Sequence, residues 1–144
     1  MTKNTTKSVV ILDSNELIFG IIGNKGYPYQ LMQSIAKLCD NFDFWISRQI
    51  VKEVLDNVQD GQKGEFFKLI TSGFLKYDGK IVDRELFLKY RNKGLKKGDV
   101  VIAAFAEMKD ADFLVSENRH FLKGLKTGKF RVLNAEHFLR EVIK

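Results

Sequence analysis

A chain of 144 residues with a net charge of +6 is long enough for one domain with a sizeable hydrophobic core, and we expect that single domain to span residues 1–144. Hydrophobic residues make up 44% and charged residues 29%, which is ordinary for a globular protein in water. The lone Cys39 excludes an internal disulfide framework and a cysteine-based zinc site, and it indicates a reducing, cytoplasmic location. No apolar stretch approaches the ~20 residues that cross a bilayer. Residues 1–7 are polar, and we expect them to be flexible.

The sequence predicts five strands separated by helices. The first strand, Val9–Leu12, is apolar without alternation, which indicates a central strand buried on both faces. Further strands are predicted at 42–46, 74–77, 113–116 and 130–133. Helices are predicted at 31–39, 48–58 behind Ser47 as a cap, 63–71, 83–91, 99–108 and 135–143. This alternation favours a parallel sheet of about five strands with helices on both sides, a Rossmann-like α/β sandwich.

Asp13, followed by Ser14 and Asn15, ends the first predicted strand. Open α/β sheets bind their ligands at the carboxyl ends of strands, so Asp13 is a candidate functional residue. A simpler interpretation is that Asp13 or Ser14 only caps the helix that follows.

Two further acids stand on predicted helices. Glu53 falls between Ile50 and Val54, beside the buried stripe of the helix after the second strand. It either extends to solvent or turns its carboxylate into a cleft at the strand ends. Asp99 opens an alanine-rich helix, where an aspartate is favoured by the helix dipole and where capping alone would explain it.

A third polar group, made of Ser116, Glu117 and Asn118, emerges where the fourth predicted strand ends. If the first and fourth strands are neighbours, this group lies near Asp13. Several carboxylates at one rim repel unless protons or cations neutralise them, and an oxygen-only donor set suits Mg²⁺ or Mn²⁺. Such an ion lowers the pKa of a bound water and offsets charge on a reacting phosphate.

The basic surplus lies mainly in the second half of the chain. Near the expected rim, Lys97 and Arg119 are candidates to bind a phosphodiester backbone. A solvated lysine-rich surface explains the same residues without a polyanionic partner.

Nearly the whole chain resembles the PIN-domain family of metal-dependent nucleases. The matching stretches are "VVILDSN", the glutamate of "SRQIVKEVL", "KGDVVIAAFAEMKDADFLVSENRHF" and the closing "FRVLNAEHFL". The resemblance implies a PIN-like fold with a first metal ion held by Asp13, Asp99 and Glu53. It also implies that Ser14, Asn15, Ser116 and Asn118 orient the metal-bound water or the substrate phosphate.

The chain departs from the family pattern after Ser116. Many members place an acid two residues beyond that hydroxyl, where this chain has Asn118, and another acid often follows where it has His120. Glu117 is adjacent and is a candidate substitute ligand, although a shift by one residue points a side chain elsewhere. The resemblance then implies a second ion that is weakly held or is recruited only with RNA.

These features favour a Mg²⁺- or Mn²⁺-dependent endoribonuclease, with Asp13, Glu53, Asp99 and Asn118 as its catalytic residues. The resemblance implies RNA as substrate, a toxin or RNA-processing role and, for a toxin, an antitoxin protein as partner; homodimers are common in the family. A first alternative is an inactive PIN-like module that binds RNA or protein, because Asn118 replaces an acid. A second is phosphoryl transfer on a small molecule with Asp13 as nucleophile, which usually requires a second acid where this chain has Asn15.

Overall fold

The computed structural model describes residues 7–142, so the predicted flexibility of residues 1–6 and the end of the last predicted helix at residue 143 lie outside the described residues. In chain order the elements are β1 Ser8–Leu12, α1 Ser14–Ile22, α2 Tyr27–Leu38, β2 Phe42–Ser47, α3 Arg48–Asn57, α4 Asp60–Thr71, β3 Lys76–Asp78, α5 Arg84–Arg91, α6 Lys97–Met108, β4 Phe113–Val115, α7 Arg119–Leu122, β5 Arg131–Leu133 and α8 Ala135–Val142.

The five strands form one sheet in the order β3-β2-β1-β4-β5, and every neighbouring pair is parallel. Leu12 at the end of β1 pairs with Val115 at the end of β4, so the two strands finish side by side. The backbone amide of Asp13 continues this pairing by donating to Val115 O at 3.0 Å. The predicted five-stranded parallel sheet is confirmed.

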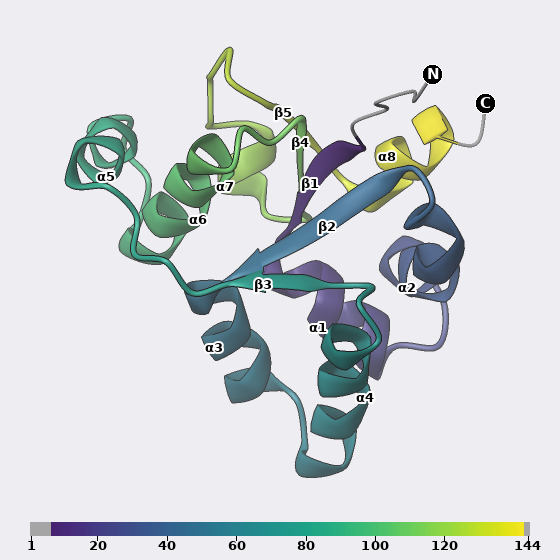
Figure 1. Ribbon diagram of the computed structural model, residues 1–144. Coiled ribbons are helices and arrows are strands. Elements are labelled where there is room, and N and C mark those ends of the chain that lie inside the picture. The colour runs from purple at the N-terminus through teal and green to yellow at the C-terminus, as the bar shows by residue number, and fades with distance from the viewer. Residues whose placement is uncertain (1–6, 143–144) are drawn as a thin grey trace, which may run out of the picture.

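Helices cover both faces of the sheet. Because parallel crossovers are right-handed, the connections β1–β2 and β2–β3 carry α1 to α4 on one face, while α5 to α7 cover the other. Figure 1 shows α1, α3 and α4 below the ribbon of β2 and β3, with α5, α6 and α7 above it. Val10, Ile11 and Leu12 of β1 are fully buried between these layers, as predicted for a central strand.

Several predicted boundaries are wrong. The helices predicted to begin at residues 31 and 63 begin at Tyr27 and Asp60. The third strand begins at Lys76 rather than at residue 74, because the amides of Phe74 and Leu75 both donate to Leu69 O and so close the end of α4. The alanine-rich helix begins at Lys97 rather than at Asp99, with Lys96 at the N-cap position. Asp99 therefore lies inside the first turn and does not cap this helix.

Ser47, by contrast, caps α3 as predicted, since its hydroxyl accepts a hydrogen bond from the Ile50 amide at 3.2 Å. Within residues 7–142, none of the helices has the length and apolar character that crossing a membrane requires.

Candidate active site

Asp13 lies in the boundary between β1 and α1 and is almost completely buried, with 3% of its surface exposed. Its Oδ1 accepts a hydrogen bond from the Ser14 amide at 2.7 Å, so Asp13 does cap α1. Its Oδ2 accepts from the Ser116 hydroxyl at 2.6 Å, across the carboxyl ends of β1 and β4. The capping interpretation is therefore correct but incomplete, because the same carboxylate also joins the neighbouring strand end.

Glu53 points from α3 toward this strand end. Its Oε1 accepts a hydrogen bond from the Ser14 hydroxyl at 2.6 Å, and its Oε2 accepts from Gln49 Nε2 at 2.8 Å. A Cβ atom at Gly98 would lie only 3.2 Å from Glu53 Oε2, so the first turn of α6 packs closely against this carboxylate. Of the two interpretations of Glu53, the structure thus favours the carboxylate turned inward.

Asp99 completes the acidic side of the site from α6. Its Oδ1 accepts a hydrogen bond from Asn118 Nδ2 at 3.2 Å. The Asn118 backbone N–H in turn donates to the Ser116 hydroxyl oxygen at 2.9 Å. One continuous hydrogen-bonded chain therefore runs from Glu53 through Ser14, Asp13, Ser116 and Asn118 to Asp99.

The site raises the pKa values of Asp13 and Asp99. Burial raises the pKa of Asp13 from 3.8 to about 6, repulsion from Glu53 and Asp99 adds to the rise, and the hydrogen bonds from Ser116 and Ser14 oppose it. Burial also raises the pKa of Asp99, and repulsion from Glu53 adds to that rise. The three carboxylates thus act on one another electrostatically, which is the condition that a cation relieves.

The donor set fits a hard cation in its chemistry, because it consists of carboxylate and hydroxyl oxygens from Asp13, Glu53, Asp99 and Ser116. Within the described part of the chain, no three Asp, Glu, His or Cys side chains lie close enough to enclose an ion directly.

Glu117 and Asn15 are not part of this chain of hydrogen bonds. They bind to each other and to the start of α8. The Glu117 Oε2 accepts from the Ala135 amide at the start of α8 at 2.9 Å, and the Glu117 amide donates to Asn15 Oδ1 at 3.2 Å. No hydrogen bond among residues 7–142 joins Glu117 to Asp13, Glu53 or Asp99. Lys97 and Arg119 are exposed first residues of α6 and α7, on either side of Asp99 and Asn118.

Glu16 was missed by sequence analysis. It is fully buried, and no donor reaches either of its carboxyl oxygens among the described residues. Burial raises its pKa to about 11, and the adjoining Glu117 carboxylate adds to the rise. Glu16 is therefore neutral near pH 7. Glu16 stands three residues after the cap Asp13, which is the position of the acid in a capping box. The sequence therefore gives no sign that Glu16 is buried and neutral.

Gln49 was missed as well, although a signal was present. Residues four apart on a helix share one face, and Gln49 precedes Glu53 by that spacing. The side-chain amide therefore fixes the second oxygen of Glu53, leaving the first for Ser14.

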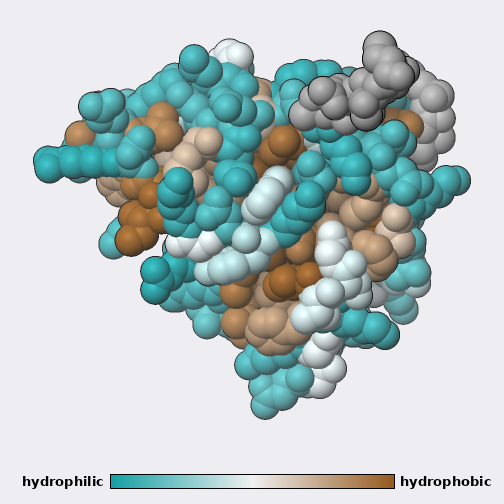
Figure 2. Space-filling model, in the orientation of Figure 1, coloured by the Kyte–Doolittle hydropathy of each residue, from teal (hydrophilic) through white to brown (hydrophobic). Residues whose placement is uncertain are grey.

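A groove of about 690 Å³ begins at Gln49 and runs between α3, α5, α6 and the β3–α5 connection. Its floor includes Val51, Phe87 and Phe105, and no described Asp or Glu lines it. Figure 2 shows this apolar surface at the left, beside the β3–α5 connection, with hydrophilic side chains around it. Ile81 on that connection lines the groove and is 78% exposed.

Comparison with known proteins supports the fold. No family model and no curated protein matches the chain. Among solved structures, the chain is similar to one in the crystal structure of VapBC2 from Rickettsia felis bound to a DNA fragment from their promoter, with 20% sequence identity and a TM-score of 0.61. The similarity covers 88% of this chain and 98% of that chain. At this identity the likeness establishes a shared fold, and the predicted PIN-like α/β architecture is confirmed.

Proposed function

We propose that this protein is a Mg²⁺- or Mn²⁺-dependent endoribonuclease. One observation carries the proposal: acids from β1, α3 and α6, far apart in the sequence, are joined by a single chain of hydrogen bonds at the carboxyl edge of the sheet. Their mutual repulsion calls for a cation, and exposed lysine and arginine residues at the same edge suit a phosphodiester substrate.

In this proposal Asp13 and Asp99 hold the ion, and Glu53 binds it through a water. When bound, the ion supplies an activated water and offsets charge on the reacting phosphate. Ser14 and Ser116 keep Glu53 and Asp13 in place through their hydroxyl hydrogen bonds. Asn118 orients Asp99 and, being neutral, adds no repulsion to the site. Lys97, at the start of α6, and Arg119, at the start of α7, bind the RNA backbone.

The test is cleavage of a mixed-sequence single-stranded RNA with added Mn²⁺. We expect the wild type to cleave and Asp13→Asn to lose at least a hundredfold in rate, because the ligand charge is removed while the side-chain shape is kept. Asp40→Asn, at an exposed aspartate after α2, is the matched control and should cleave as the wild type does. Unchanged cleavage by Asp13→Asn would refute the site.

An inactive RNA-binding module remains the second candidate, and Asn118 is the observation in its favour. Metal binding separates the two functions. If Mn²⁺ does not raise the melting temperature of the wild type and no cleavage occurs, while RNA still binds in a salt-sensitive way, the binding module is the correct function.

We also propose a protein partner for the 690 Å³ groove, namely an acidic, partly apolar segment such as an antitoxin would supply. The groove offers an apolar floor with Arg48, Lys80 and Arg84 around it, which matches such a segment in charge. The VapBC2 neighbour supports this proposal through its fold alone. The test measures the affinity of the protein encoded by an adjacent short reading frame for the wild type and for Arg84→Glu. If the two affinities are equal, this groove is not its docking site.

A further inference from the structure

A smaller hollow lies between the α5–α6 connection and α7. It has a volume of about 140 Å³ and is lined by Lys93, Gly94, Leu95, Lys96, His120 and Gly124. Its described lining contains two lysines and a histidine but no acid. The hollow is therefore a cationic pocket of the size of a small anion rather than of an apolar ligand.

The pocket adjoins the acidic site directly. Lys96 is the N-cap residue of α6, three positions before Asp99. The His120 amide donates to Asn118 Oδ1 at 2.9 Å, and the other end of that side chain donates to Asp99. Lys96 and His120 both act on Asp99 electrostatically and lower its pKa against the effect of burial. An anion in the pocket would thus lie next to whatever Asp99 binds.

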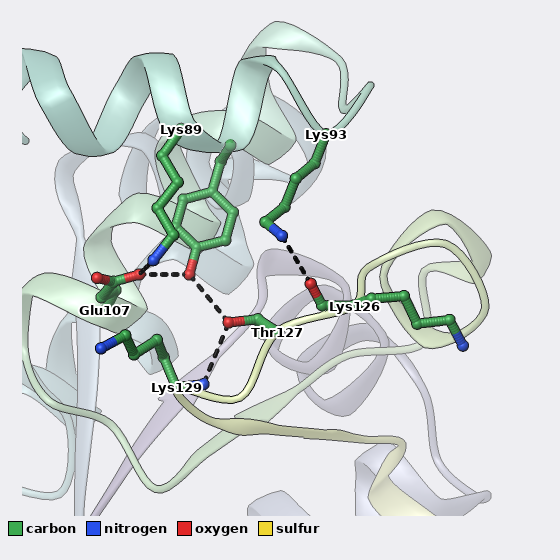
Figure 3. Close-up of polar contacts among 7 residues, drawn as sticks. Lys89, Lys93, Glu107, Lys126, Thr127 and Lys129 are labelled. Carbon is green, nitrogen blue, oxygen red and sulfur yellow. Dashed lines mark hydrogen bonds and ion pairs between the residues drawn. The ribbon is translucent and has the colours of Figure 1, made fainter.

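The walls of the pocket are held together by the contacts in Figure 3. Lys93 Nζ donates to Lys126 O at 2.9 Å and so ties the α5–α6 connection to the segment after α7. Behind it, the fully buried Tyr90 donates its hydroxyl proton to Glu107 Oε1 at 2.6 Å and lies 3.4 Å from Thr127 Oγ1. These contacts fix two segments distant in sequence, so the pocket is preformed.

The lysine side chains that line the pocket have N–H donors left for a ligand. The ammonium group of Lys93 has three N–H donors, of which the Lys126 carbonyl takes one. Lys96 is exposed, and no hydrogen bond or ion pair within residues 7–142 engages its ammonium group. The pocket therefore offers unused cationic donors beside a site that handles phosphate.

We propose that this pocket binds one backbone phosphate of the RNA strand, adjacent to the phosphate that is cleaved. The proposal rests on the proposed function in that the strand must run past Asp99. Lys96 and His120 supply the contacts, and Lys93 supports them. A single strand held there and at the acidic site has its scissile bond positioned by two anchors, which is how remote binding groups assist a reaction.

The test measures RNA binding without metal, so it does not depend on hydrolysis. Binding of a labelled single-stranded RNA is followed by fluorescence anisotropy in EDTA over a series of salt concentrations. For a single strand, each lost phosphate contact makes the negative slope of log affinity against log salt shallower by ~0.7. We expect that change for Lys96→Gln, with about fivefold weaker binding near 0.1 M salt. The double variant with His120→Gln should lose more.

Lys37→Gln is the matched control, because Lys37 is an exposed lysine on α2, away from the pocket. Equal slopes for Lys96→Gln and Lys37→Gln, or no RNA binding by the wild type in EDTA, would overturn the proposal. So would stabilisation by free inorganic phosphate that Lys96→Gln abolishes without any effect on RNA binding, because the pocket would then bind a free anion. If Asp13→Asn still cleaves RNA while the slope changes as expected, the proposed catalytic site fails and the phosphate pocket stands.

Discussion

Replacing Asp13 by asparagine should make the protein more stable at neutral pH. Asp13 is buried, and its pKa in the folded protein is about 6 rather than 3.8. Since the folded state holds this proton more tightly than the unfolded chain, stability is lost as the pH rises from 3.8 through 6. Asparagine keeps the shape and one acceptor, and its amide can donate to the Ser116 oxygen in place of the present hydrogen bond.

The magnitude follows from the two pKa values. The raised pKa of Asp13 costs folding about 3 kcal/mol at pH 7 and about 1 kcal/mol at pH 4.5. The free energy of unfolding of Asp13→Asn, measured in urea, should exceed that of the wild type by these amounts. Saturating Mn²⁺, at about 100 times its dissociation constant, should return about 2.7 kcal/mol to the wild type and little to the variant.

Asp40→Asn, whose carboxylate is exposed, should change the free energy of unfolding by less than about 0.5 kcal/mol at either pH. The reasoning fails if Asp13→Asn is less stable than the wild type at pH 7 and the difference is the same at pH 4.5. That result would mean that the ionised carboxylate is satisfied by Ser14 and Ser116 and that its neighbours do not repel it.

Two further substitutions test neighbouring features. Glu16→Gln should raise the free energy of unfolding by up to about 3 kcal/mol at pH 7, because folding the wild type must protonate a carboxyl whose pKa rises from 4.5 to about 11. Urea titrations from pH 6 to 9 should show wild-type stability falling with pH and the fall absent in Glu16→Gln; parallel curves would contradict a neutral Glu16. Gly98→Ala should stabilise α6 by up to about 1 kcal/mol yet weaken Mn²⁺ binding, because the new Cβ lies 3.2 Å from Glu53 Oε2. Unchanged Mn²⁺ affinity by calorimetry would show that Glu53 moves aside freely.

Much of the fold follows from local patterns in the sequence. The uninterrupted apolar run of β1 could only be a central strand, and the stripe behind Ser47 could only be an amphipathic helix. Once the strands are parallel, their carboxyl ends share one edge. The pairing of β1 with β4, which the sequence analysis left as a condition, then makes Asp13 and Ser116 neighbours. Boundaries were less predictable where tertiary contacts decide them. The segment at Phe74 has strand-forming residues, but its amide serves the end of α4 instead.

The role of a site residue could be predicted where it depends on the helix or strand that carries the residue. It could not be predicted where it depends on a contact with a residue distant in the sequence. Glu53 was found from its place beside a buried stripe. The pKa of Glu16 is raised in part by Glu117, which lies 101 positions away in the sequence, and no pattern near Glu16 indicates that the two residues are close. The same holds for the cationic pocket, since Lys96 and His120 come from segments that only the fold brings together.

Asp13 and Glu16, three residues apart at the start of α1, show how donors decide the fate of a buried acid. Asp13 receives hydrogen bonds from the Ser14 amide and the Ser116 hydroxyl, which hold its pKa near 6 in spite of burial. Glu16 receives none and faces another carboxylate, so a proton neutralises it throughout the physiological range. Hydrogen-bond donors do not remove charge, whereas a proton does. Asp13 therefore remains available to a cation at neutral pH, and Glu16, although equally buried, does not.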